Sequence, residues 1–209
     1  MVHNRIGTGR PGRKRLLRAT QCPAKVAAVD TLAPGFLIAM PQLGDPNFHR
    51  AVVLVVEHND RGSMGLILNR STALTLKEFA KSQSLALAPL RKAEPVFLGG
   101  PVERERGFLL HDSVLPVERT EVAPGLFLSV TVDALQPLLM DGDCRLRFCL
   151  GYAGWGPGQI ERELAEGSWL FSEAQREAVL GQSPDDIWES ALKTLGVAPA
   201  MLQVVKGVQ

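Results

Sequence analysis

The sequence lacks the long apolar segments that would place a protein in a membrane. Its longest purely apolar runs, such as Ala51–Val56, fall far short of the roughly 18 residues that a membrane-spanning helix needs. The basic N-terminus also has no apolar stretch of about 7 to 15 residues, which a secretory signal requires. We therefore expect a cytoplasmic protein with no membrane contact.

Cysteine is scarce as well. The chain has three, Cys22, Cys144 and Cys149, far below the density of a disulfide-stabilised scaffold. If Cys144 and Cys149 lie on one strand, their odd spacing points them to opposite faces, which argues against a shared metal or a disulfide. We expect free thiols.

Motifs of common enzyme classes are also missing. No GxxxxGK[ST] loop is present, which excludes P-loop phosphoryl transfer, and Gly62–Gly65 is one residue short of a GxSxG nucleophile motif. His49, His58 and His111 each have a carboxylate residue nearby in the sequence, but no pair has HExxH or similar ligand spacing. The sequence predicts no catalytic residues, no metal site and no cofactor.

Acidic residues are absent from the first 29 positions, which carry seven Lys and Arg residues. The rest of the chain has 16 basic against 22 acidic residues, a formal charge of −6. We expect residues 1–29 to form a disordered basic arm and residues 30–209 to form the folded domain. The arm could contact nucleic acid, it could be only a solvated extension, or the start of translation could lie further along the chain.

What is present suits a single α+β domain. A length of 209 residues with 45% hydrophobic side chains is enough for one sizeable core. Strands are predicted at residues 35–40, 51–58, 63–69, 96–98, 107–111, 126–130 and 145–150. Turn residues 59–62 indicate an antiparallel hairpin between the second and third strands, which favours α+β over a wound parallel sheet. The charged run Glu103–Arg106 is expected to be an exposed loop or edge.

Helices are predicted from their capping residues. Thr75 and Glu78 have capping-box spacing, so a short helix should begin there. Near the C-terminus, Ser183 is a suitable N-cap with proline at the first helical position, and Gly196 is a natural stop. The other two helices are predicted at residues 132–140, interrupted near Pro137, and at residues 160–165.

The glycine-rich stretch Gly151–Gln159 lies between a predicted strand and a predicted helix. Backbone amides at such a junction could bind an anion, although Glu161 just downstream would oppose a phosphate. The glycine spacing does not match a dinucleotide-binding fingerprint, and a purely structural bend is the alternative. The candidate ligand-binding residues here are Gly154, Trp155, Gly156, Gly158 and Glu161.

A second polar cluster flanks the predicted hairpin. Its members, all candidates for ligand binding, are Asp45, Asn47, His49, Arg50, Asn69 and Arg70. In an antiparallel hairpin, Arg50 before one strand and Arg70 after the next should lie at the same end of the sheet. There they could offer two guanidinium groups to an anionic ligand. Structural salt bridges to nearby carboxylates are the alternative.

Several ordered blocks resemble the YqgE/AlgH family of bacterial proteins. They are GYAGWGPGQIERE at residues 151–163, PGFLIAMPQLGDPNFHRAVVLVVEH at 34–58, GLILNR at 65–70 and FLGGPV at 97–102. The resemblance spans roughly residues 32–196 and leaves out the basic arm. It implies a compact α+β domain with coiled, partly antiparallel sheets, located in the bacterial cytoplasm and without an established enzymatic activity.

Three hypotheses of function follow. The leading one is a non-enzymatic protein that binds an unknown small anionic ligand or a protein partner. The second is a regulator of transcription that contacts DNA, because the family that the chain resembles carries a transcription-regulatory label. Because the predicted helices are acidic, nucleic acid could be contacted only through the arm. The third is an unrecognised enzyme whose Asp45, His49, Arg50 and Glu161 line one pocket.

Overall fold

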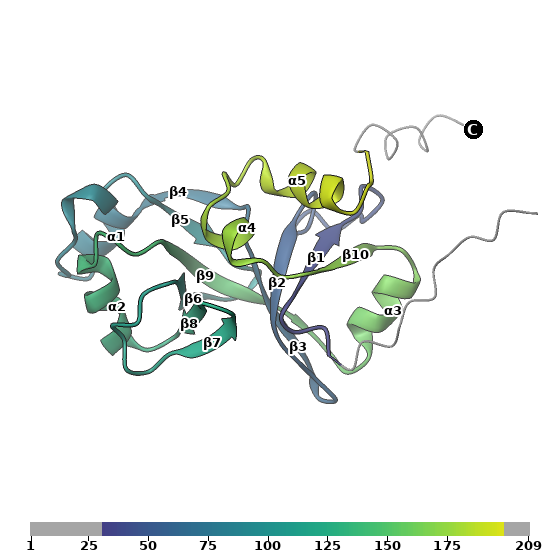
Figure 1. Cartoon of the computed structure of the whole chain (residues 1–209), viewed down its shortest axis with the longest axis horizontal. Helices are drawn as coiled ribbons and strands as arrows, with labels where there is room; N and C mark the ends of the chain where they lie inside the picture. Colours follow the sequence, from purple (N-terminus) through teal and green to yellow (C-terminus); the bar gives the residue numbers. More distant parts are fainter. Residues whose placement is uncertain (1–30, 199–209) are drawn as a thin grey trace, which may run out of the picture.

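The computed structural model describes residues 31–198 as an elongated molecule built on one curled sheet of ten strands (Figure 1). The strands are β1 Gly35–Ala39, β2 Val52–Asn59, β3 Gly62–Ile67, β4 Ser71–Thr75, β5 Pro95–Leu98, β6 Val102–His111, β7 Thr120–Ala123, β8 Leu126–Ser129, β9 Leu146–Trp155 and β10 Trp169–Glu173. The helices are α1 Leu76–Ser82, α2 Val132–Met140, α3 Gln159–Ala165, α4 Arg176–Leu180 and α5 Ile187–Thr194, with a 3₁₀ turn at Pro89–Arg91. The predicted basic arm and Cys22 lie outside the described residues.

The sheet has the order β10-β1-β2-β3-β9-β6-β8-β7, with β5 on β9 and β4 on β5. Only the β5–β9 pair is parallel among the described strands, and the other pairs are antiparallel. The predicted α+β class is therefore confirmed. The predicted hairpin is also present, because β2 pairs with β3 around the turn before Gly62.

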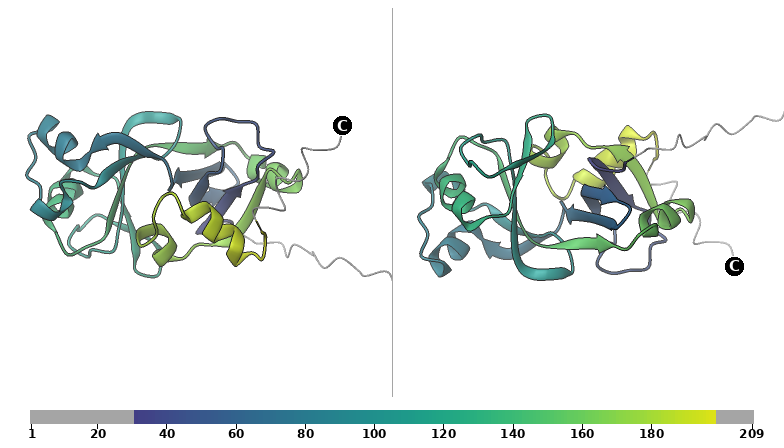
Figure 2. Two further views of the ribbon diagram at one scale, coloured as in Figure 1. Left: turned by 90° about the horizontal axis from the view of Figure 1, so that it is seen from above. Right: turned by 90° about the horizontal axis from the view of Figure 1, so that it is seen from below.

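Strand β9 joins the two ends of the molecule. It pairs with β3 near its C-terminus, with β5 at Cys149 and Leu150, and with β6 between Leu146 and Tyr152. Figure 2 shows α1 and α2 at one end of the elongated outline and α3 at the other. The prediction ended this strand at residue 150 and was too short, because the backbone turns at Gly151 (φ 73°) and then continues the ladder to Trp155.

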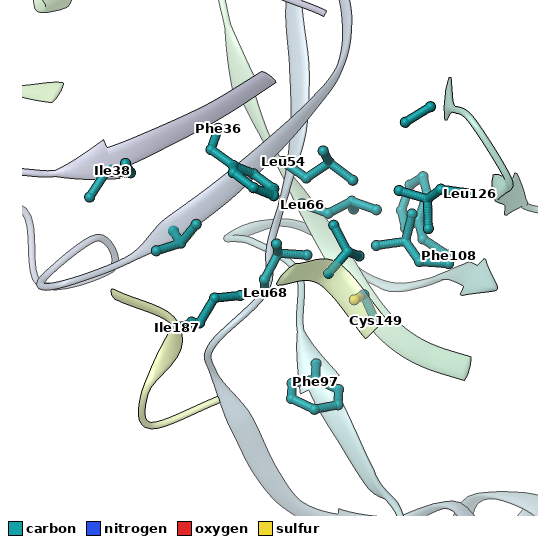
Figure 3. Packing of buried hydrophobic residues seen from close by; sticks show 14 of the residues in the cluster. Phe36, Ile38, Leu54, Leu66, Leu68, Phe97, Phe108, Leu126, Cys149 and Ile187 are labelled. Atoms are coloured by element: carbon teal, nitrogen blue, oxygen red, sulfur yellow. The ribbon is translucent and has the colours of Figure 1, made fainter. Parts of the chain in front are cut away.

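One cluster of the core links the two halves of the sheet. Phe36 of β1 and Leu54 of β2 pack in it with Phe108 of β6 and Leu126 of β8 (Figure 3). Strand β1 is buried on both faces, because Phe36 and Ile38 enter this cluster while Leu37 and Ala39 enter a second one beneath α3. Burial from both sides makes β1 and β2 a rigid base for the loop between them.

Two helix predictions need correction. Helix α2 runs without interruption through Pro137, because Ala134, Leu138 and Leu139 are buried and this packing outweighs the loss of one backbone hydrogen bond. Helix α5 begins at Ile187 with Asp186 as N-cap, since residues 183–186 form a turn in which the Ser183 carbonyl accepts from two amides. The capping box at Thr75 and Glu78 is present as predicted.

The charged run Glu103–Arg106 is exposed, as predicted, although it belongs to β6 and is not a separate loop. It bulges away from β9 between Val102 and Gly107. No helix within residues 31–198 has the length and apolarity needed to cross a membrane.

Candidate functional site

The end of the β2–β3 hairpin brings the 49–50 and 69–70 segments together. Asn69 Oδ1 accepts from the Val52 N–H at 2.9 Å, and Asn69 Nδ2 donates to the Arg50 carbonyl at 2.8 Å. The Arg70 guanidinium donates to the His49 carbonyl. We call His49, Arg50, Asn69 and Arg70 the arginine corner. The structure thus brings together the four residues that the sequence placed on either side of the hairpin.

Arg50 is held in an unusual conformation. Its φ of 52° lies in the left-handed region, which is costly for a residue with a Cβ and persists only when neighbours enforce it. Asn69 holds its carbonyl, and its guanidinium lies over the Trp188 ring, 5.1 Å from the centroid. Trp188 is itself fixed by an indole N–H bond to the Ala39 carbonyl at 2.9 Å. The side chain remains exposed to solvent.

Arg70 is half-buried, and desolvation lowers the pKa of its guanidinium. None of the salt bridges formed within residues 31–198 involves Arg50 or Arg70, so the expected alternative of structural salt bridges is absent there. A guanidinium that has lost hydration without gaining a carboxylate is stabilised by any anion that reaches it. The corner can therefore hold a carboxylate or phosphate group.

Asp45 and Asn47 shape the preceding loop. The Asn47 backbone N–H and side-chain Nδ2 both donate to Asp45 Oδ1, at 2.8 and 2.9 Å. This turn positions Phe48, whose ring stacks on Trp155 with 6.1 Å between centroids and meets Trp169 edge-on at 5.4 Å. The two polar residues thus stabilise the loop, and their side-chain hydrogen bonds do not involve the arginine corner.

Trp155 is part of the core. Only 6% of it is exposed, and its indole N–H donates to Glu163 Oε2 at 3.1 Å. Trp169 donates to the same oxygen at 2.8 Å. The glutamate therefore joins the end of β9 to the start of β10 through two indoles, and this part of the glycine-rich segment has a structural role.

The remaining glycine-rich residues form the bend into α3. Gly158 has the positive φ of 65° that the bend requires, and the Gly156 amide is occupied by Gln159 Oε1 at 3.0 Å. Gly154 lies within β9. Glu161 faces His58, with 3.6 Å between Oε1 and Nε2, and His58 Nδ1 contacts Ser63 Oγ at 2.8 Å. The contacts of Glu161 thus do not bring it to the 45–50 loop, as the enzyme hypothesis required.

A cavity of about 280 Å³ lies between α5 and strands β1 and β10. Residues that line it include Phe36, Val52, Glu173, Gln182, Ile187 and Ser190, and we call it the α5 cavity. Gln182 Nε2 donates to Ser190 Oγ at 3.3 Å, whereas Gln182 Oε1 is buried and has no hydrogen-bond partner among residues 31–198. Sequence reasoning missed this cavity. Ser190 and Thr194 share a helical face, but nothing in the pattern shows that the face turns inward.

Metal ligation finds no support at either place. Within the described part of the chain, no three His, Cys, Asp or Glu side chains gather closely enough to hold a metal ion. Cys144 and Cys149 are free, and burial raises the pKa of each thiol to about 12. Such thiols stay protonated at neutral pH and are poor nucleophiles.

Comparison with known proteins gives consistent results. Residues 36–200 match the family model DUF179, described as AlgH-like. A UPF0301 protein of Myxococcus xanthus is 60% identical, covering 85% of this chain and 98% of its own length. A second, from Ruegeria pomeroyi, is 41% identical, covering 82% and 95%. The solution structure of the AlgH protein from Pseudomonas aeruginosa superposes with a TM-score of 0.68 at 35% identity, covering 86% of this chain and 97% of that one.

Proposed function

This chain belongs to the AlgH-like family, and we propose that it is a non-enzymatic binding protein that recognises an anionic small ligand or protein partner at the arginine corner. The observation that carries the proposal is the pair of arginines at one end of the β2–β3 hairpin. Neither has a carboxylate partner within residues 31–198, and one is partly desolvated.

The corner is organised before any ligand arrives. The Asn69 and Arg70 side chains donate hydrogen bonds to the carbonyls of residues 50 and 49, and the Arg50 guanidinium lies over the ring of Trp188. A preorganised cation loses little conformational entropy on binding, so more of the charge-assisted hydrogen-bond energy is available for affinity. A cytoplasmic location goes with this proposal and is supported by the free thiols of Cys144 and Cys149.

The test is calorimetric titration of the whole chain with inorganic phosphate and pyrophosphate. We expect binding that weakens with salt and that falls by about tenfold or more in Arg50→Gln, because one charge-assisted bond contributes about 1.5–3 kcal/mol. The Arg50 side chain makes no hydrogen bond in the described structure, so the fold should be unaffected. Arg61→Gln, at the exposed opposite end of the same hairpin, is the matched control.

Equal affinities for wild type, Arg50→Gln and Arg61→Gln would show that the anions do not bind at the arginine corner. Absence of binding by wild type to either anion at low salt, together with failure to capture any acidic protein partner, would overturn the proposal altogether.

A further inference from the structure

We propose that the arginine corner and the α5 cavity form one binding site for an amino-purine nucleoside monophosphate, with the base in the cavity and the phosphate at Arg50. This inference rests on the proposed function and names the class of ligand for the same site. It follows from the size of the cavity, its hydrogen-bonding groups, its position and its charge.

The cavity has the size and walls expected for one flat ring system. Its volume of about 280 Å³ lies just below the range for drug-sized ligands, which begins at about 300 Å³. Phe36, Val52 and Ile187 are buried apolar residues that form part of the wall. Apolar walls of this kind pack against the faces of a heterocycle, while its edge meets polar groups.

The polar groups of the cavity favour a ligand that donates hydrogen bonds. Gln182 Oε1 is an acceptor that is buried and unpartnered, and Glu173 adds a carboxylate at the rim. The Ser190 hydroxyl accepts from Gln182 Nε2 and keeps its own proton for a ligand acceptor. An exocyclic amine next to a ring nitrogen, as in adenine, offers one donor and one acceptor side by side.

The cavity and the corner share a wall. Val52 lines the cavity, and its backbone N–H is held by Asn69 of the corner at 2.9 Å. Ile187 also lines the cavity, and the Arg50 guanidinium lies over the ring of the next residue, Trp188. The residues of the corner do not line the cavity themselves, so the proposal places the anionic end of the ligand outside the cavity, on the side of Trp188. Glu173 disfavours an anion inside the cavity, whereas the guanidinium favours one outside it.

The charge pattern thus requires a dipolar ligand. One end is an uncharged, donor-bearing ring, and the other is an anion a few bonds away. A nucleoside monophosphate combines both, because its ribose separates the base from the phosphate. Arginine is well suited to the phosphate, since its planar group donates two parallel hydrogen bonds.

The experiment is calorimetry on the whole chain with four probes: adenosine 5′-monophosphate, purine riboside 5′-monophosphate, adenosine and inorganic phosphate. We expect adenosine monophosphate to bind at least about tenfold more tightly than each of the others, because leaving a buried group such as Gln182 Oε1 without a donor costs about 1–3 kcal/mol. Purine riboside monophosphate has the same charge and nearly the same size but carries a hydrogen in place of the amine, so this edge of its ring has no donor.

Variants separate the two halves of the site. Gln182→Leu should weaken adenosine monophosphate by about tenfold and leave phosphate unchanged, whereas Arg50→Gln should weaken both. Gln83→Leu, at an exposed position after α1, is the control. Ser190→Ala is a second cavity variant that removes only one hydroxyl, so it remains informative if Gln182→Leu does not fold by circular dichroism.

Two outcomes distinguish this inference from the proposed function. If phosphate binds in an Arg50-dependent way but the nucleotide binds no more tightly than phosphate, or purine riboside monophosphate binds as well as adenosine monophosphate, the nucleotide inference is overturned and the anion proposal stands. If adenosine binds in a Gln182-dependent way, phosphate does not bind and Arg50→Gln leaves the affinity for adenosine monophosphate unchanged, the arginine corner is not an anion site. Both the proposed function and the shared site are then overturned.

Discussion

The arginines of this protein differ mainly in what their guanidinium groups contact. Arg147 is 5% exposed and ties distant segments together through the carbonyls of Leu68, Val179 and Gln182. Arg91 is also buried, with Glu94 and backbone carbonyls as partners. In contrast, within the described part of the chain the Arg70 guanidinium contacts one carbonyl and that of Arg50 contacts an aromatic ring. Residue type alone could not distinguish these roles, because partners come from segments far away in the sequence.

Glu163 gives a prediction at the residue scale. Its Oε2 accepts hydrogen bonds from the indoles of Trp155 and Trp169, both almost fully buried. Glu163→Ala leaves two buried donors unpaired, and we expect the free energy of unfolding to fall by about 2–4 kcal/mol. Urea denaturation followed by tryptophan fluorescence measures this. Glu161→Ala, on the exposed side of α3, should change stability by less than about 1 kcal/mol. A comparable loss of stability in both variants would contradict the role of Glu163 as the shared acceptor of the two indoles.

His111 gives a pH prediction. It is buried, its ring nitrogens contact the Ser113 carbonyl and Ser129 Oγ at 3.0 Å, and desolvation lowers its pKa below the ordinary value of 6.5. On acidification the unfolded chain therefore binds this proton before the folded one. The free energy of unfolding should fall as the pH drops below about 6.5.

The check is chemical denaturation at several pH values between about 5.5 and 7.5. We expect His111→Gln to flatten this part of the stability profile relative to wild type, whereas His49→Gln, at an exposed position, should retain the wild-type slope. Identical slopes for wild type and His111→Gln would show that His111 does not titrate as proposed here.

Among the elements, β9 matters most, because it carries the pairing between the two ends of the molecule. Its first residues form the strand that the sequence predicted, but Arg147, Phe148 and Cys149 are all buried, and its extension past Gly151 was missed. Strands β4, β7 and β10 and helix α4 were missed as well, each being only four or five residues long. Elements this short gain stability from the partner strand or core on which they pack, and no local pattern reports that partner.

Two glycines with the same φ of 73° allow a controlled test of β9. A Cβ on Gly151 would lie 2.6 Å from the Gly100 carbonyl oxygen and 2.9 Å from that of Val102, whereas a Cβ on Gly167 would have nothing within 4 Å. Gly167→Ala should cost about 1–2 kcal/mol, from backbone conformation alone. Gly151→Ala should cost at least about 2 kcal/mol more, because rigid backbone must move. Thermal and urea unfolding measure both, and equal costs would argue against the close packing of β5, β6 and β9.

For the whole molecule, charge separates the basic arm from the acidic remainder. Residues 1–29 contain seven of the basic residues and none of the acidic ones, and they lie outside the described structure. We expect DNA binding by the full chain, if measured at low salt, to be lost on deletion of residues 1–29, because the remainder has a formal charge of −6.

The measurement is fluorescence anisotropy with labelled duplex DNA over a range of salt concentrations. The truncated chain should keep the phosphate binding that depends on Arg50, which serves as its folding control. Undiminished DNA affinity after truncation would place the contact in the acidic part and refute the arm hypothesis.

Local sequence was sufficient for several features of the fold. The β-branched valines of β2, the turn residues before Gly62 and the capping box at Thr75 each specify backbone geometry within a few positions, so the hairpin and α1 could be predicted. The blocks that mark the family are likewise contiguous. The nearness of Arg50 to Arg70 followed from the hairpin alone.

The character of the site came from contacts between distant segments. Trp188 supports Arg50 while bonding to Ala39, which lies 149 positions earlier, and Gln182 is enclosed between helix and sheet. Whether a polar group keeps its hydration, gains a partner or is left unpaired depends on which segments cover it. Burial of that kind is a property of the packed molecule. It distinguishes Arg50 and Arg70 from the buried arginines, Arg91 and Arg147, whose guanidinium groups hydrogen-bond within the core.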